Sequence, residues 1–181
     1  MQHNRYHMKP QDVLLLLKLI ALDDPSWQQV PVAKALHMSQ GEISQSASRL
    51  KFARLLDGSG KQIMRQTFMD FIQFGLAVVF PVQPGPVVRG LPTAHAAAPL
   101  SALIQSSGSN YSELFVWPHP FGEAKGQAIQ PLYRSVPEAA LSDPELYALL
   151  ALCDAVRACR TREKSLALGE LQRRIVGDGG D

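Results

Sequence analysis

The amino-acid sequence predicts a mainly α fold with a small β element, and three observations lead to this prediction. Hydrophobic residues make up 46% of the 181 residues, so the chain can bury a core. Apolar residues recur at helical spacing after clear helix start signals, both near the N-terminus and near the C-terminus. The segments that look extended lie between these two parts, where proline and glycine are frequent.

Two helices are expected at the start of the chain. Proline is favoured at the first position of a helix, and Asp12 suits the dipole of the first turn, so a first helix begins near Pro10. It ends before the Asp-Asp-Pro sequence of residues 23–25. A second helix is expected from about Val30 to Leu36.

The third predicted helix opens at Ser39 and has two distinct faces. Ser39 and Glu42 have the spacing of a capping box, in which each side chain accepts a hydrogen bond from the backbone N–H of the other residue. The apolar stripe, at helical spacing, consists of Ile43, Ala47 and Leu50. The opposite face is small and polar and consists of Gly41, Ser44, Gln45, Ser48 and Arg49.

The middle of the chain is expected to be less regular. After a turn at residues 57–60, a short extended piece leads to a helix from about Arg65 to Phe74. Residues 80–100 are rich in Pro and Gly and show little periodicity, and their apolar side chains indicate a segment that lies over a surface of the protein. Strands are expected at Leu114–Pro118 and about Gln127–Leu132, with Phe115, Trp117 and Phe121 as the core of the β element.

The C-terminal part is expected to be helical. Capping boxes at Ser135 and Ser142 open a short helix and then a longer one through about Ala158. The longer helix has an apolar stripe of Leu146, Leu149, Leu150 and Cys153, and a final helix runs from about Arg162 to Ile175. The predicted domains are residues 1–65, a helix with the Pro/Gly-rich segment at 66–105, and a C-terminal α+β region at 106–181.

Several functional classes find no support in the sequence. There is no phosphate-binding loop and no nucleophile elbow, and neither His95 nor His119 has a second ligand at metal-binding spacing, so we expect no enzyme activity, cofactor or metal. The apolar run from Val13 to Leu22 is too short to span a membrane. With two cysteines and no signal-peptide pattern, a reducing cytoplasm is the expected location.

The third helix has the features of a helix that contacts DNA. Small and hydrogen-bonding residues near its start let the backbone approach the major groove, where Gln can pair with adenine and Arg with guanine. Residues 1–65 carry nine Lys or Arg and five Asp or Glu, whereas the remainder carries nine and eleven. The candidate base-contacting residues are Ser39, Gln40, Gly41, Ser44, Gln45, Ser48 and Arg49, and the candidate phosphate contacts are Lys34, Lys51, Arg54 and Lys61.

The segment "VAKALHMSQGEISQSASRLKFARLL" resembles the winged helix-turn-helix core of bacterial transcription regulators, the MarR-like and related groups. The resemblance covers about residues 9–65 and implies an N-terminal winged helix-turn-helix domain, which the α+β C-terminal region predicted above would follow. It implies that the helix Ser39–Leu50 is the recognition helix of a repressor that binds double-stranded DNA as a homodimer. The sequence departs from the family in lacking its Gly at Arg54 or Leu55 and in showing no clear two-stranded wing.

The role of the rest of the chain is open between alternatives. Phe68, Phe71 and Phe74 are candidates for a dimer interface, because one short helix carries all three. The C-terminal region can bind a small-molecule effector or a partner protein, and the latter would make the protein antitoxin-like, with the helix-turn-helix regulating its own operon. A segment 80–100 that wraps a partner would become ordered only in the complex, whereas one that lines a ligand pocket would be ordered alone. A scaffold without DNA binding is the third alternative.

Overall fold

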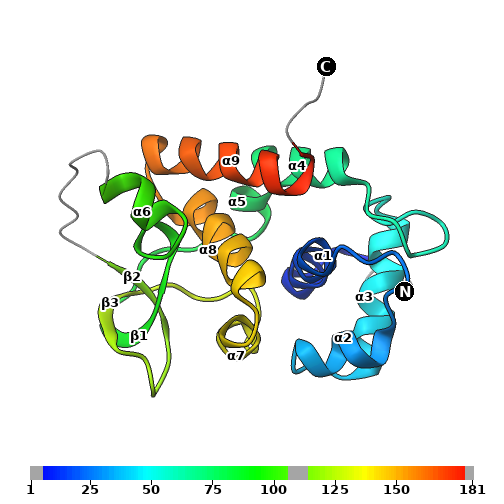
Figure 1. The fold of residues 1–181 in the computed structure, drawn as a ribbon, viewed down its shortest axis with the longest axis horizontal. Coiled ribbons are helices and arrows are strands. Elements are labelled where there is room, and N and C mark those ends of the chain that lie inside the picture. Colours follow the sequence, from blue (N-terminus) through cyan, green and yellow to red (C-terminus); the bar gives the residue numbers. More distant parts are fainter. Residues whose placement is uncertain (1–5, 106–113, 178–181) are drawn as a thin grey trace.

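The computed structural model describes residues 6–105 and 114–177. Within these ranges the chain is mainly helical and has a small three-stranded sheet, as the sequence predicts (Figure 1). Figure 1 shows the N-terminal helices at one end of the molecule and the sheet at the other. Buried side chains from both ends belong to one continuous core. In the described part of the chain, no helix combines the length and the apolar character needed to cross a membrane.

The N-terminal helices begin close to their predicted positions, with Pro10 as the first residue of the first helix. The Ser39 hydroxyl caps the third helix by accepting a hydrogen bond from the Glu42 N–H at 3.1 Å. The other half of the predicted capping box is wrong, because the Glu42 carboxylate instead accepts hydrogen bonds from the side chains of Gln11 and Arg49. The three helices are α1 (Pro10–Leu22), α2 (Gln29–Ala35) and α3 (Gln40–Phe52).

Helices α2 and α3 end in the same backbone motif. The second residue after each helix is left-handed, with φ of 51° at His37 and 59° at Arg54. The N–H of Arg54 donates to the Lys51 carbonyl and the N–H of Leu55 to the Leu50 carbonyl, which is the pattern of a Schellman cap. Glycine adopts this conformation without strain, so a side chain at Arg54 carries a conformational cost.

The prediction for residues 80–100 is wrong in part. After α4 (Arg65–Phe74), which has its predicted bounds, and the short α5 (Leu76–Val79), residues Val87–Thr93 form strand β1. Because β1 obtains its hydrogen bonds from strands later in the chain, its own Pro- and Gly-containing sequence gives little sign of it. A 3-10 turn, η1 (Ala94–Ala96), and α6 (Leu100–Gln105) follow.

The sheet is closed, because each of its strands pairs with the other two. The first half of β1 runs antiparallel to β3 (Ala124–Ala128) and its second half antiparallel to β2 (Phe115–Pro118), while β2 and β3 are parallel. Gly90 lies where the two halves meet, and a Cβ there would be 2.0 Å from the Trp117 carbonyl oxygen. This close approach requires glycine. The Trp117 side chain is buried as predicted, but Phe121 is 86% exposed, so its predicted place in the core is wrong.

The C-terminal helices surround α8 (Pro144–Ala158), the longer helix predicted from the sequence. Helix α8 packs against α1, against the sheet and against the helices before and after it. Its predicted stripe, from Leu146 to Cys153, is buried. Its cap is the Asp143 carboxylate, which accepts from the Leu146 N–H, and not the predicted Ser142. The predicted cap at Ser135 is also wrong, since that hydroxyl makes no capping hydrogen bond. The helices are α7 (Val136–Leu141), α8 (Pro144–Ala158) and α9 (Thr161–Ile175).

Buried polar groups connect α8 to the other parts of the fold. The Asp154 carboxylate accepts hydrogen bonds from the Thr93 hydroxyl on β1 at 2.8 Å and from the Trp117 indole on β2 at 2.6 Å. Arg157 lies 2.8 Å from the same carboxylate. On the other side, the Lys18 ammonium of α1 lies 2.7 Å from the Asp143 carboxylate. These contacts hold the sheet and α1 at fixed positions on α8.

Candidate nucleic-acid interface

The exposed face of α3 brings most of the predicted base-contacting residues together. The opposite side of the helix is buried through Ile43, Ala47 and Leu50, and α3 packs against both α1 and α2. At Gly41 there is open space, since an added Cβ would meet nothing closer than the Ser39 hydroxyl at 3.9 Å. The exposed residues of this surface, named here the α3 face, are Ser39, Gln40, Gly41, Ser44, Gln45 and Ser48.

Arg49 does not belong to the α3 face, and its predicted contact with a base is wrong in this structure. Its side chain is 3% exposed, and its Nε and NH2 groups donate to the Asp12 carboxylate of α1 at 2.7–3.1 Å. The NH2 group also lies 2.8 Å from Glu42. Burial acts to lower the pKa of Arg49, but the hydrogen bonds to Asp12 and Glu42 outweigh it and raise the pKa. Arg49 therefore holds α3 against α1.

Sequence reasoning missed Asp12 as the partner of Arg49. A weak signal was present, because Arg49 follows Ser46 by three residues and Glu42 by seven, which places all of them along the edge of the apolar stripe. The Ser46 hydroxyl indeed donates to the Asp12 carboxylate at 2.5 Å. The local sequence pattern does not indicate which carboxylate on another helix pairs with Arg49. The pair could therefore be identified only from the tertiary structure.

The predicted phosphate contacts divide into two groups. Lys34, Lys51 and Arg54 are exposed, and Lys51 continues the α3 face because it follows Ser48 by three residues. Lys61 is engaged elsewhere: its ammonium donates to the Trp27 carbonyl and lies 4.8 Å from the centroid of the Trp27 ring. Three of the four predicted cations are therefore exposed to solvent.

The segment after α3 contains one β-bridge, between Leu56 and Ile63, and no two-stranded wing within the described residues. The turn between them is organised by Asp57, whose carboxylate accepts hydrogen bonds from the N–H groups of Lys61 and Gln62 at 3.0 Å each. The bond from the Gln62 N–H, aided by that from the Ser59 hydroxyl, holds the pKa of Asp57 at about 2. This compact turn occupies the position where the resemblance implies a wing.

The three aromatic dimer candidates have different environments. Phe68 is fully buried in the core, so its predicted place in a dimer interface is wrong. Phe71 is half-buried and packs edge-to-face on Phe80 at 6.3 Å between ring centroids. Phe74 is 74% exposed and is the member of the set that a second molecule can reach.

Two further polar clusters in the described residues contain the histidines that the sequence singles out. His95 Nδ1 lies 3.5 Å from the Cys159 sulfur, but burial raises the pKa of Cys159 to about 11. A reactive cysteine needs the opposite shift, so this thiol is protonated at neutral pH. His119 Nε2 lies 2.8 Å from Glu138. No group of three His, Cys, Asp or Glu side chains suited to a metal is found in the described ranges.

No family model, curated protein or solved structure matches the chain significantly. The resemblance to MarR-like regulators therefore depends on the quoted residues of the N-terminal part.

Proposed function

We propose that this protein is a sequence-specific DNA-binding transcriptional regulator, a repressor that places α3 in the major groove. The observation that carries the proposal is the α3 face, which offers small and hydrogen-bonding residues on the exposed side of a helix whose other side is fixed in the core. Helices α2 and α3 pack against each other and are separated by residues 36–39, a connection of the length found in helix-turn-helix units.

Five of the six residues of the α3 face have a defined chemical role in contacting DNA in this proposal, and the sixth, Ser39, caps the helix. Gln40 and Gln45 can form two hydrogen bonds with adenine, and the Ser44 hydroxyl can donate to or accept from several bases. The Ser48 hydroxyl donates to the Ser44 carbonyl at 3.0 Å and can still accept a hydrogen bond. Gly41 lets the backbone approach the groove. The exposed cations Lys34, Lys51 and Arg54 would neutralise phosphates and give an affinity that falls with salt. A homodimer would present two such helices to successive major grooves.

The test is a salt-titrated binding assay of the full chain with DNA from upstream of its own gene and with random duplex DNA of equal length. Gln45→Ala should reduce the preference for the specific duplex by about 1–3 kcal/mol, the value of one good base contact. Lys51→Ala should weaken binding to both duplexes and lower the salt slope by about 1. A wild type that prefers no duplex at moderate salt contradicts the proposal.

A matched control is available on α4. Gln73 is also an exposed glutamine on a helix, but it lies outside the α3 face. Gln73→Ala should change neither affinity nor preference. If Gln73→Ala has the same effect as Gln45→Ala, the α3 face is not the interface.

A second candidate function is an antitoxin-like protein-binding module. It is favoured by three exposed apolar side chains close together in sequence on α4 and α5, of which Phe74 is 74%, Val78 79% and Val79 51% exposed. Against a partner-wrapping role for residues 80–100, β1 is already hydrogen-bonded within the isolated chain. The two candidates are separated by Phe74→Ser: a DNA-binding regulator that does not use this surface keeps its DNA affinity, whereas a partner-binding module loses its partner.

A further inference from the structure

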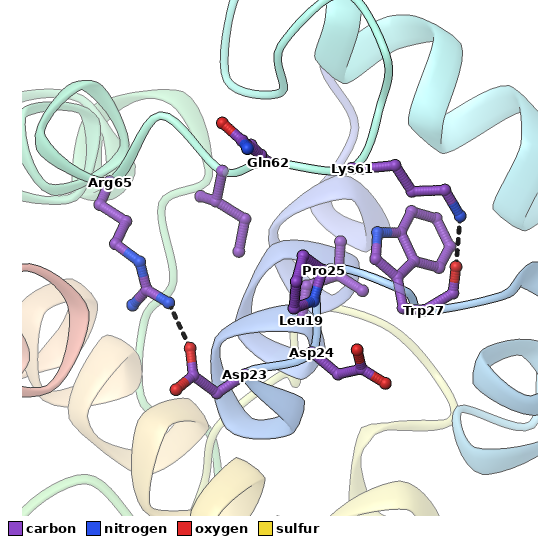
Figure 2. Close-up of a pocket in the computed structure, with 9 residues that line it drawn as sticks. Leu19, Asp23, Asp24, Pro25, Trp27, Lys61, Gln62 and Arg65 are labelled. Carbon is purple, nitrogen blue, oxygen red and sulfur yellow. Dashed lines mark hydrogen bonds and ion pairs between the residues drawn. The ribbon is translucent and has the colours of Figure 1, made fainter.

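A pocket of about 310 Å³ lies between the end of α1 and the segment that follows α3 (Figure 2). This volume is at the lower end of the roughly 300–1,000 Å³ found for small-molecule sites. Its apolar surface comes from Leu19, Pro25, Ile63 and the flat ring of Trp27, and charged side chains lie at its rim. The volume and the lining suit one small ring compound.

Trp27 gives the pocket an unpaired hydrogen-bond donor. The side chain is 5% exposed, and its Nε1 has no hydrogen-bond partner among the described residues. Figure 2 shows this nitrogen on the edge of the ring that is turned toward Pro25 and the interior of the pocket, away from the Lys61 ammonium. A buried donor without a partner costs about 1–3 kcal/mol, and an acceptor supplied by a ligand would remove that cost. Because the nitrogen is enclosed, a small adjustment of the ring accompanies such binding.

The charges at the rim balance, because Asp23 and Asp24 are matched by Lys61 and Arg65. Arg65 already donates to the Asp23 carboxylate at 2.7 Å and to the Ile175 carbonyl at 2.8 Å, and Lys61 donates to the Trp27 carbonyl. Asp24 also lies at the rim, and hydrogen bonds from Ser26 lower its pKa, so this carboxylate is ionised at neutral pH. The rim therefore has no net charge and both cations are already engaged, so a charged occupant would lose its hydration without gaining a free partner.

We propose that this pocket is a binding site for a small uncharged ring compound that carries a carbonyl-type acceptor. The ring lies at the edge of the Trp27 indole against Leu19, Pro25 and Ile63, and its acceptor receives the hydrogen bond of Trp27 Nε1. The pocket lies between the end of α1 and the segment that follows α3. A bound compound would contact both and could therefore change the position of α3 relative to α1. That regulatory role rests on the proposed DNA-binding function, whereas ligand binding itself does not.

The test uses the two indole N–H signals of the full-length protein in ¹H–¹⁵N NMR spectra, since the chain has two tryptophans. Benzamide is the neutral probe and benzoate is its anionic counterpart, both added up to about 10 mM, where weak fragments with millimolar Kd are detected. Benzamide should shift the Trp27 signal downfield in a saturable way. The Trp117 signal is the internal control, because that indole is already bonded to Asp154 and should not move.

Two comparisons make the result decisive. Benzoate should bind at least about fivefold more weakly than benzamide, because the rim has no net positive charge to offset the desolvation of the benzoate carboxylate. Trp27→Phe retains a flat ring without the donor and should weaken benzamide binding about fivefold to tenfold, followed through the backbone signals of Gln62 and Arg65. Absence of a saturable shift, equal binding of benzoate, or unchanged affinity in Trp27→Phe would each overturn the proposal.

The regulatory role is examined separately with fluorescently labelled DNA from upstream of the gene. Benzamide at saturation should change the DNA affinity of the wild type and leave that of Trp27→Phe unchanged. If the NMR shift is observed but no DNA is bound, the ligand site stands and the proposed function fails. If DNA is bound but the NMR shift is absent, the ligand site fails and the proposed function stands.

Discussion

At the scale of single residues, the pairing of Arg49 with Asp12 decides how α3 is presented. The Asp12 side chain is fully buried and Arg49 is 3% exposed, so both charges have been removed from water. Such a pair contributes little net stability compared with apolar residues, but removal of one partner leaves an uncompensated buried charge. The pair therefore fixes a geometry more than it adds to the stability of the fold.

Arg49→Ala should lower the free energy of unfolding by about 3–5 kcal/mol, as expected when one member of a buried ion pair is lost. Urea denaturation followed by circular dichroism measures this change. The double variant Asp12→Leu with Arg49→Met is the control, and it should lose less than the single variant because no buried charge is left alone. If Arg49→Ala is as stable as the wild type but has lost its preference for specific DNA, Arg49 contacts a base and does not act through the buried ion pair.

Asp57 illustrates a residue-scale effect on an exposed group. Its pKa is about 2 in the folded protein, below the ordinary value of 3.8, because of hydrogen bonds from the Gln62 N–H and the Ser59 hydroxyl. Since the folded pKa is the lower one, the contribution of this carboxylate to stability is present above about pH 4 and is lost as the pH falls toward 2. The turn should therefore loosen only in strong acid.

An NMR titration of the Asp57 carboxyl carbon should have its midpoint near pH 2, and Ser59→Ala should move this midpoint toward 3.8. Ser26→Ala is the matched control, because Ser26 donates to Asp24 and not to Asp57. A wild-type midpoint at the ordinary value would mean that these hydrogen bonds are not formed in solution.

At the scale of elements, α2 and α3 end in a regular hydrogen-bonded cap, but the left-handed position of each cap is not glycine. Both helices end in Schellman hydrogen bonds, for which glycine is usual, yet His37 and Arg54 occupy the left-handed positions. The resemblance places a Gly at or next to Arg54, and the backbone conformation of Arg54 is the one that such a Gly would have. Arg54 therefore adopts a backbone conformation that glycine would adopt without strain.

Arg54→Gly should raise the free energy of unfolding by about 0.5–1 kcal/mol, because a non-glycine residue pays to adopt a left-handed conformation. Ala53→Gly is the control one residue earlier: Ala53 is right-handed at φ −74°, so glycine there should lower stability. Thermal unfolding of both variants measures the difference. If the proposed function is correct, Arg54→Gly also weakens DNA binding through loss of a phosphate contact, while the fold gains stability.

The elements that were predictable from sequence are those specified by neighbouring residues. The start of α1 at Pro10, the cap of α3 at Ser39 and the bounds of α4 follow from local signals, and the structure confirms them. β1 and the Asp12–Arg49 pair were not predictable, because their partners lie far away in the sequence. The same limit applies to the candidate site: the exposure of Gln45 followed from helical periodicity, whereas the burial of Arg49 did not.

At the scale of the whole molecule, α1 belongs to two packing arrangements at once. It packs against α3 and also against α8, and its core residues from Val13 to Leu17 are fully buried. The ion pair of Lys18 with Asp143 and the hydrogen bond from Arg65 to the Ile175 carbonyl add polar links between residues 1–65 and the rest. The predicted domain boundary at residue 65 is therefore crossed by a continuous core, and we expect the two parts to unfold together.

The two tryptophans allow this expectation to be tested, because Trp27 lies beside α1 and Trp117 lies in the sheet. In Trp117→Phe the fluorescence comes from Trp27, and in Trp27→Phe it comes from Trp117. In each variant the urea midpoint by fluorescence should coincide with the midpoint by far-ultraviolet circular dichroism, as a two-state transition requires. A Trp27 transition at lower urea than the loss of helix would instead identify residues 1–65 as a separate domain. In that case the α3 face could change its orientation without the unfolding of α8. Coincident midpoints mean instead that α1 and α8 unfold as one cooperative unit.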